Sequence, residues 1–290
     1  MKQLFTLMAT AMLCTAARAQ SDTTITPNKE SDTIRIGNMI IIKKGGNNES
    51  KNKYTHIEVE KKYRSKPSNI STNWAILDLG FNNYTDKTDY GNTGGYLYNR
   101  PGTAPLGAND FALNTGKSVN VNIWLFMQRL NLIKHHVNLK YGLGIELNNY
   151  RYNSNISYLK QNPYTPNQTP APVIIRDSIY FSKNKLATDY VTIPLMINFC
   201  TRPDNINKGF SLSAGVSVGY LYNQRNKQIS HERGKLKTKN GLGVEEFKFS
   251  YVAELGYGPL HLYGSYTPKT IYKTGLDMRP YTFGIRFSNW

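Results

Sequence analysis

The chain has 290 residues, 39% of them hydrophobic and 19% charged, with a formal net charge of +17 and a mean hydropathy of −0.50. Beyond the first residues, no apolar run reaches the roughly 18 residues that a membrane-spanning helix needs, which excludes a bundle of such helices. The 21 tyrosines favour strands and the membrane–water interface, where the ring is buried and the hydroxyl is wet.

The N-terminal residues predict a secretory signal peptide over 1–19. A basic start is followed by a short apolar run and by a small-residue cleavage site at 17–19. Leu13 stands directly before Cys14, where resemblance to a lipoprotein signal would require a small residue. The other cysteine of the chain is Cys200, so the mature protein is predicted to form no internal disulfide.

Residues 20–73 are polar and rich in lysine, and we predict that they form a periplasmic N-terminal segment. An apolar patch at 34–42 is followed by a Gly-Asn-rich turn and by an alternating stretch at 54–60. This pattern predicts either a short hairpin or a mostly disordered tether. A sharper alternative is a docking strand that pairs with a periplasmic partner through exposed backbone.

Eight later stretches alternate apolar and polar residues. In 137–148 every odd position is apolar and every even position is polar or glycine, so one face of the strand is oily and the other is wet. The alternation lasts roughly ten residues at a time, the length that a tilted strand needs to cross a bilayer. The predicted strands lie at about 74–84, 117–129, 137–148, 187–200, 209–224, 245–258, 260–270 and 281–287.

The links between these strands alternate in length. Long links cover about 85–116, 153–186, 225–244 and 270–279, whereas the others are short turns. Outer-membrane barrels carry long loops outside and short turns in the periplasm, and closure removes the unpaired backbone edges that lipid cannot tolerate. Residues 74–290 are therefore predicted to form an all-β, eight-stranded, antiparallel up-and-down transmembrane β-barrel with both termini in the periplasm.

Two strands carry more detailed predictions. The outward face of the second strand is predicted to consist of apolar residues that end at Met127, with Gln128 on the inner face. In the fourth strand, Pro194 cannot donate a backbone hydrogen bond and predicts a bulge or a local defect in the ladder.

Charged residues fall on the inner face, which is costly unless they are paired or hydrated. Four of them lie at a similar height near the periplasmic rim, and two more lie higher in the barrel. We predict a salt-bridge network that plugs the lumen, with Asp78, Lys140, Glu254 and Arg286 in the lower layer and Glu146 with Lys248 as the upper pair. Plugging is favoured over ion passage because side chains fill an eight-stranded barrel.

No arrangement of residues predicts catalysis. His261 and Ser265 share a strand face, but four residues along a strand span about 13 Å, too far for a nucleophile and its base. No metal-binding spacing occurs, and we assign no catalytic, cofactor-binding or metal-binding residue and no cofactor. The remaining histidines are predicted to be solvated turn residues: His56, His135, His136 and His231.

The positive charge is concentrated in the N-terminal segment and in the fifth link. Loss of the signal peptide would take the formal net charge from +17 to +15, because Lys2 and Arg18 leave with it. An extracellular basic loop is expected to face lipopolysaccharide phosphates, and nucleic-acid binding is not expected of a secreted chain with oily strands. The cations of the fifth link oppose a single acid, Glu232: they are Arg225, Lys227, Arg233, Lys235, Lys237 and Lys239.

Several motifs together carry a resemblance to a known family. They are the signal peptide, the segment DTIRIGNMIIIKKGG, the strands VNLKYGLGIELNN and FSLSAGVSVGY, and the aromatic ending YTFGIRFSNW. The chain resembles the PorT-like outer-membrane β-barrel proteins of Gram-negative cells, which implies insertion by the outer-membrane assembly machinery. The ending departs from the usual assembly signal, because the outward set stops at Phe287 and Trp290 falls in the opposite register.

We therefore expect a non-enzymatic protein of the cell outer membrane with a structural or surface-interaction role, whose basic extracellular loops face lipopolysaccharide. The alternative, suggested by the name of the PorT-like family, is an accessory factor for protein secretion or envelope assembly with a periplasmic or secretion-system partner. A small-solute pore or a lipid-modifying enzyme forms a third, less favoured class.

Overall fold

The computed structural model describes residues 32–36, 39–43, 68–162, 172–203 and 208–288, and the chain divides into two units, Met1–Lys66 and Pro67–Trp290. In the first unit, β1 (Asp32–Ile36) and β2 (Met39–Lys43) pair antiparallel, with Ile36 opposite Met39. A Gly-Asn dipeptide lies between two runs of β-branched residues, which is a sequence typical of a tight hairpin. The hairpin thus lies within the apolar patch itself, while the stretch at 54–60 and the predicted signal peptide fall outside the described residues.

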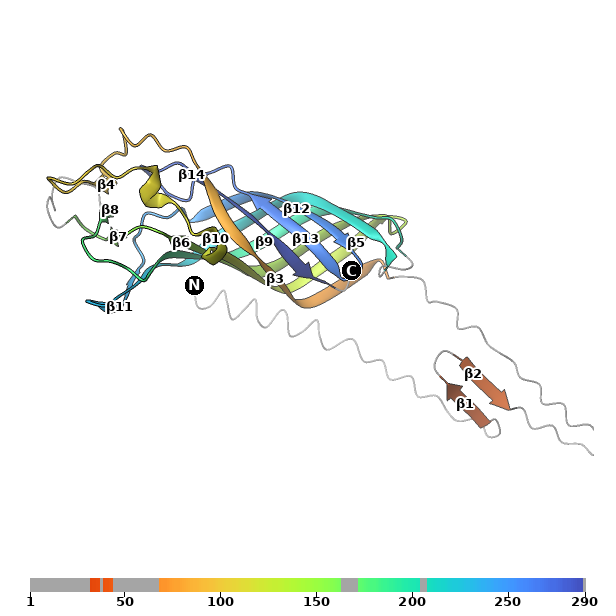
Figure 1. Ribbon diagram of the computed structural model, residues 1–290. Helices are drawn as coiled ribbons and strands as arrows, with labels where there is room; N and C mark the ends of the chain where they lie inside the picture. The colour runs from red at the N-terminus through yellow and green to blue at the C-terminus, as the bar shows by residue number, and fades with distance from the viewer. Residues whose placement is uncertain (1–31, 37–38, 44–67, 163–171, 204–207, 289–290) are drawn as a thin grey trace, which may run out of the picture. The chain divides into compact units, whose positions relative to one another are not determined.

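The second unit is built on eight long strands that pair in a ring (Figure 1). Each strand pairs antiparallel with the next, and the last pairs with the first, so the predicted order of eight strands is confirmed. The long links gather at one end of the ring and the short turns at the other. The strands are β3 (Ile70–Asp86), β5 (Val119–Ile133), β6 (Val137–Tyr152), β9 (Lys183–Cys200), β10 (Phe210–Ser230), β12 (Phe247–Tyr257), β13 (Leu260–Tyr266) and β14 (Met278–Phe287).

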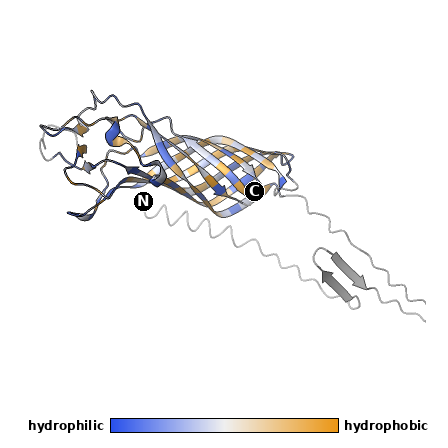
Figure 2. Ribbon diagram, in the orientation of Figure 1, coloured by the Kyte–Doolittle hydropathy of each residue, from blue (hydrophilic) through white to orange (hydrophobic). Residues whose placement is uncertain are grey.

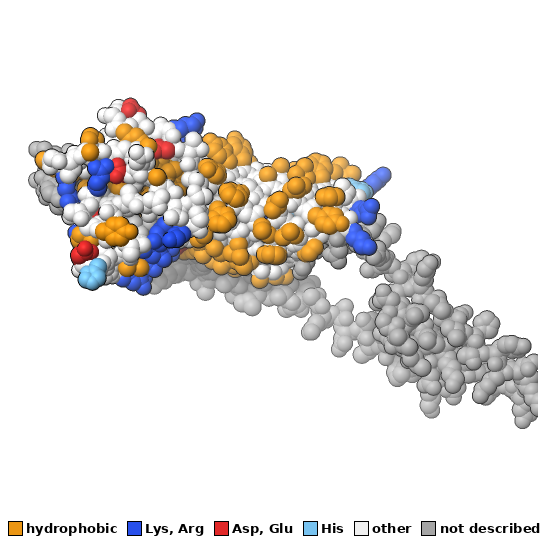
Figure 3. Space-filling view, viewed as in Figure 1, with side chains coloured by type: hydrophobic (Ala, Val, Ile, Leu, Met, Phe, Trp, Pro, Cys, Tyr) orange, Lys and Arg blue, Asp and Glu red, His pale blue; other side chains and the backbone are white. Residues whose placement is uncertain are grey.

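Successive side chains of each ring strand face alternately the outside and the inside of the ring. Leu262 on β13 and Phe199 on β9 are 54% and 53% exposed, whereas Asp78 on β3 is fully buried inside the ring. Apolar and polar residues alternate along the visible strands of the ring in Figure 2, and Figure 3 shows apolar side chains over its visible wall. The outer wall is therefore apolar and the interior polar, the reverse of a water-soluble sheet.

The prediction for Met127 was wrong, because β5 carries a bulge. Trp124 pairs with Gly144 but Phe126 pairs with Leu143, so the intervening Leu125 adds one residue to β5 and reverses the alternation beyond it. Leu125 stays exposed, and Met127 turns inward and is fully buried.

The prediction of a local ladder defect at Pro194 is confirmed. Pairing of β9 with β6 stops at Tyr141 opposite Leu195 and resumes at Gly144 opposite Thr192, without a change of register. On its other side, Pro194 stays opposite Ser217 of β10 in an unbroken register. The proline lacks an N–H to donate, so the ladder is interrupted and not bulged.

The long links fold into a cap at one end of the ring, with its own three-stranded sheet of β4 (Leu97–Tyr98), β7 (Ile156–Leu159) and β8 (Val173–Arg176). Two short 3-10 helices, η1 (Ala108–Phe111) and η2 (Thr115–Lys117), belong to the first link. The fifth link was predicted to be a loop, but it is mostly a hairpin in which β10 continues and pairs with β11 (Gly234–Lys239).

Tyrosines fill the core of the cap. Tyr152 from the ring, Tyr158 from β7 and Tyr272 from the last link are buried, and their three hydroxyls hydrogen-bond one another at 2.7, 3.1 and 2.6 Å. Each hydroxyl can donate to the next, so all three are satisfied without water. Side chains of Phe111 and Leu242 belong to the same core, so all four long links contribute to one packed unit.

Candidate functional site

The lower layer of inward charges forms one connected network. Arg286 donates from Nε to Asp78 Oδ1 at 2.6 Å and from Nη2 to Oδ2 at 2.7 Å, and its Nη1 contacts Glu254. The second oxygen of Glu254 accepts from Lys140 and from Ser213. The predicted layer of two acids and two bases is therefore confirmed, and its charges balance.

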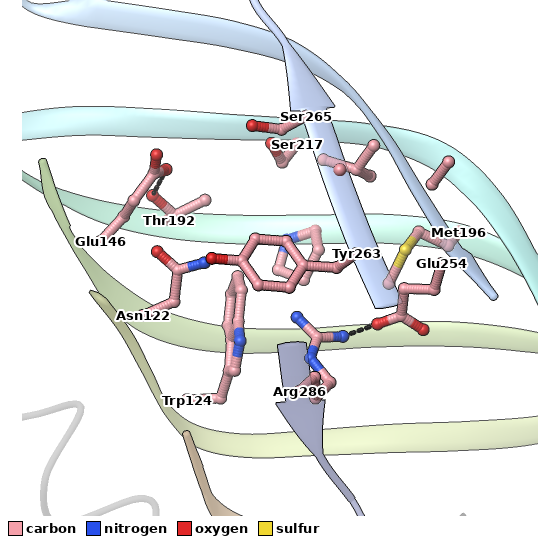
Figure 4. A pocket seen from close by; sticks show the side chains of 14 residues that line it. Asn122, Trp124, Glu146, Thr192, Met196, Ser217, Glu254, Tyr263, Ser265 and Arg286 are labelled. Atoms are coloured by element: carbon pink, nitrogen blue, oxygen red, sulfur yellow. Dashed lines mark hydrogen bonds and ion pairs between the residues drawn. The ribbon is translucent and has the colours of Figure 1, made fainter. Parts of the chain in front are cut away.

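Aromatic and amide groups complete the surroundings of this network. Trp124 Nε1 and Asn122 Nδ2 donate to Asp78 at 2.7 and 3.1 Å. The guanidinium of Arg286 lies 5.3 Å from the Trp124 ring and 5.9 Å from the Tyr263 ring (Figure 4). A buried carboxylate with a bidentate arginine and two further donors is well compensated for the loss of water. Sequence reasoning missed the two aromatic contacts, because the rings come from strands far apart along the chain.

The upper pair is also confirmed. Lys248 forms an ion pair with Glu146 and lies 5.6 Å from the centre of the Tyr190 ring. Glu146 also accepts a hydrogen bond from Asn148 at 3.0 Å and one from Thr192 at 3.4 Å, the latter drawn in Figure 4. This pair is again neutral as a unit.

Little open space remains between the two layers. A cavity of about 30 Å³ lies there, bordered by Glu146 above and by Arg286 and Glu254 below. Such a volume holds at most one or two water molecules. Beside it, Tyr263 extends along the inner wall from β13, past Gly284 of β14 and Gly80 of β3, and donates to Asn120 Oδ1 on β5 at 2.5 Å. Charged, amide and aromatic side chains therefore occupy the interior at these two levels of the ring.

The described histidines lie at three separate places: the β5–β6 turn, the β10–β11 turn and β13. His261 is buried inside the ring opposite Arg286, and Ser265 is on the same strand, hydrogen-bonded to Thr282. At the opposite end from the cap, His136 Nδ1 lies 2.8 Å from the backbone oxygen of Cys200. Within the described ranges, no group of three His, Cys, Asp or Glu side chains could hold a metal ion. His56 lies outside those ranges.

A ring of antiparallel strands, apolar outside and filled by paired charges, defines a β-barrel protein. Residues 76–269 match the family model of the outer membrane protein beta-barrel domain. This match covers well over half of the chain, and the chain belongs to that family. No curated protein matches the sequence. The described residues include no helix that is long and apolar enough to span a bilayer.

Proposed function

We propose that this protein is a transmembrane barrel of the Gram-negative outer membrane that carries out no chemistry, seals its own lumen and holds a folded cap on the cell surface. The observation that carries this proposal is the apolar outer wall. Exposed residues such as Ile193, Leu212, Phe249 and Ile285 come from different strands around the ring. An apolar surface that extends around the ring would cause aggregation in water, whereas it is stable in contact with lipid tails.

A lumen filled by side chains favours an anchoring role over a pore. Eight strands enclose a space that side chains fill, and here the charged layers and the Tyr263 side chain occupy it. The cap core adds a second closure, because inward residues Tyr150 and Leu186 of the ring belong to the same cluster as the loop residues. The surface that remains for function is the outside of the cap and of the strand extensions below it.

The partners we propose are outer-membrane lipid and lipopolysaccharide, with the assembly machinery acting at insertion. The basic residues of the fifth link lie on the cap side of the apolar wall, at the level where headgroup phosphates would begin. We propose no nucleic-acid partner for a chain with this apolar outer wall.

A second candidate is an accessory factor for protein secretion or envelope assembly, as the PorT-like resemblance suggests. The supporting observation is the β1–β2 hairpin in the N-terminal unit, because a two-stranded sheet has edges that can accept a partner strand. Co-purification from envelopes with and without residues 20–73 tests it. Loss of a specific partner on deletion would favour this role, and an unchanged set of partners would rule it out.

Vesicle insertion and conductance test the main proposal. The chain without its signal peptide, refolded into phospholipid vesicles, should resist alkaline extraction and should produce no stable conductance in planar bilayers. A monomer that stays soluble without detergent and does not enter vesicles would overturn the proposal. Steady unit conductance would overturn the sealed lumen, and release of fatty acid or sugar from purified outer-membrane lipid would overturn the non-enzymatic role.

A further inference from the structure

Cations from four neighbouring strands meet on one outward face beside the cap. We call this group the basic face: it consists of Arg151, Lys183, Lys185, Arg225, Lys227, Lys235, Lys237 and Lys239. Five of the six cations predicted from the fifth link belong to it. The sixth, Arg233, instead forms an ion pair with Asp177 at 2.8 Å. The sequence could not show that β6 and β9 would contribute the other three.

The strand register aligns these cations in rows. Arg151 of β6 lies opposite Lys185 of β9, Lys185 lies opposite Lys227 of β10, and Lys227 lies opposite Lys237 of β11. A second row brings Arg225 opposite Lys239. Like charges directly opposite each other destabilise a sheet. Consistent with this, Lys235 and other nearby cations hold the pKa of Lys237 below its usual value.

Few acids compensate for this repulsion. In the described part of the chain, Asp189 is the carboxylate that pairs with the basic face, through Arg225 at 2.6 Å. By contrast, the buried charges of the lumen balance one to one. The charges inside the ring are neutralised, but the lysines of the basic face are aligned with little compensating negative charge. We infer that an anion from outside the protein supplies this negative charge.

The position of the basic face beside the apolar wall indicates what kind of anion this is. A bulge between Leu221 and Asn223 shifts the alternation of β10, so that Arg225 and Lys227 point outward like Tyr220 below them. Tyr220 forms an exposed aromatic pair with Phe247, with ring centres 5.2 Å apart. Figure 3 shows Lys and Arg side chains gathered along one side, where the apolar wall meets the cap. Cations and aromatic rings thus follow one another along the outward face of β10.

We propose that the basic face and the Tyr220–Phe247 pair together form a binding site for one phosphorylated glycolipid of the outer leaflet, lipopolysaccharide. A row across four strands covers about 14 Å, which suits a disaccharide headgroup with a phosphate at each end. The phosphates would accept from the lysines, and the acyl chains would lie against the aromatic pair. This proposal rests on the membrane location proposed above and adds a defined site to it.

The test compares two matched variants of the full chain in phospholipid vesicles. K185Q/K227Q/K235Q/K237Q removes four cations of the basic face, and K117Q/K134Q/K160Q/K208Q removes four exposed lysines elsewhere. The probes are lipid A with two phosphates, lipid A with one, and the dephosphorylated lipid, each titrated at low and at physiological salt. We expect the first variant to bind diphosphorylated lipid A at least tenfold more weakly, and the control variant to bind like the wild type.

Several results would overturn the site. Equal weakening in both variants would show general charge attraction, and binding that ignores the number of phosphates would exclude phosphate recognition. Equal affinity for free pyrophosphate or for a short DNA duplex would exclude a lipid site. The first variant should insert into vesicles and resist urea at least as well as the wild type, because it relieves repulsion. Failure of the wild type to insert would refute the membrane proposal, whereas insertion without lipid A discrimination refutes the site alone.

Discussion

Removal of Arg286 should destabilise the barrel severely, because this side chain holds two buried acids. The substitution R286M deletes two short hydrogen bonds to Asp78, the contact with Glu254 and the stacking against Trp124. It leaves the lower layer with two carboxylates and a single cation, Lys140. Breaking a buried ion pair from one side costs about 3–5 kcal/mol, and we expect a loss of that size in the free energy of unfolding.

The double variant D78N/R286M separates lost charge balance from lost packing. The amide oxygen introduced at position 78 would still accept from Trp124 and Asn122, and the Lys140–Glu254 pair would remain, so the layer becomes neutral again. We expect the double variant to be more stable than R286M by about 2 kcal/mol or more, because a neutralised buried pair often costs little. An exposed pair supplies the control: K273M breaks the contact of Lys273 with Glu246 and should cost at most about 1 kcal/mol.

Urea unfolding in vesicles, followed by tryptophan fluorescence and by heat-dependent mobility on gels, measures all three variants. If R286M lies within the range of K273M, or if the double variant is as unstable as R286M, the buried network is not what stabilises the lumen.

Three further predictions concern the cap and the outer wall. Y272F should lower the free energy of unfolding by about 1–3 kcal/mol, because it removes two of the three hydrogen bonds of the tyrosine triangle; of the remaining Tyr152–Tyr158 pair, one buried hydroxyl hydrogen then lacks an acceptor. Y180F at an exposed position should have no effect, and protease resistance of the cap measures both variants. L262R should lower the free energy of unfolding by about 2–4 kcal/mol if Leu262 faces the bilayer centre, whereas L236R on β11 should be tolerated. Equal urea midpoints for the two variants would contradict a lipid-facing outer wall. Burial raises the pKa of Asp177, but hydrogen bonds from Ser157 and Arg233 outweigh this effect and hold the pKa below its usual value. The contribution of Asp177 to stability is therefore present at neutral pH and is lost as the pH falls below about 4. The urea midpoint of the wild type should therefore fall more steeply between pH 6 and pH 3 than that of D177N, and parallel slopes would refute the assignment.

Apolar and polar residues alternate along these strands with a period of two residues. This pattern is a local property of the sequence, so it allowed the strands and their inner faces to be predicted. Side chains two residues apart share a face, so eight alternating stretches predicted both the exposed set on β9 and β12 and the inward position of Asp78, Lys140, Glu146, Lys248, Glu254 and Arg286. Their similar heights above the short turns also indicated which charges would meet, since charges inside a narrow lumen must pair.

The tertiary structure decided everything that depends on register and on closure of the ring. Arg286 meets Asp78 because the last strand pairs with the first, and Tyr263 reaches Asn120 only because closure of the ring brings β5 within three strands of β13. A one-residue bulge at Leu125 turned Met127 inward, since an added residue reverses the alternation beyond it. The rows of the basic face arise in the same way, from cross-strand neighbours that lie tens of residues apart in the chain.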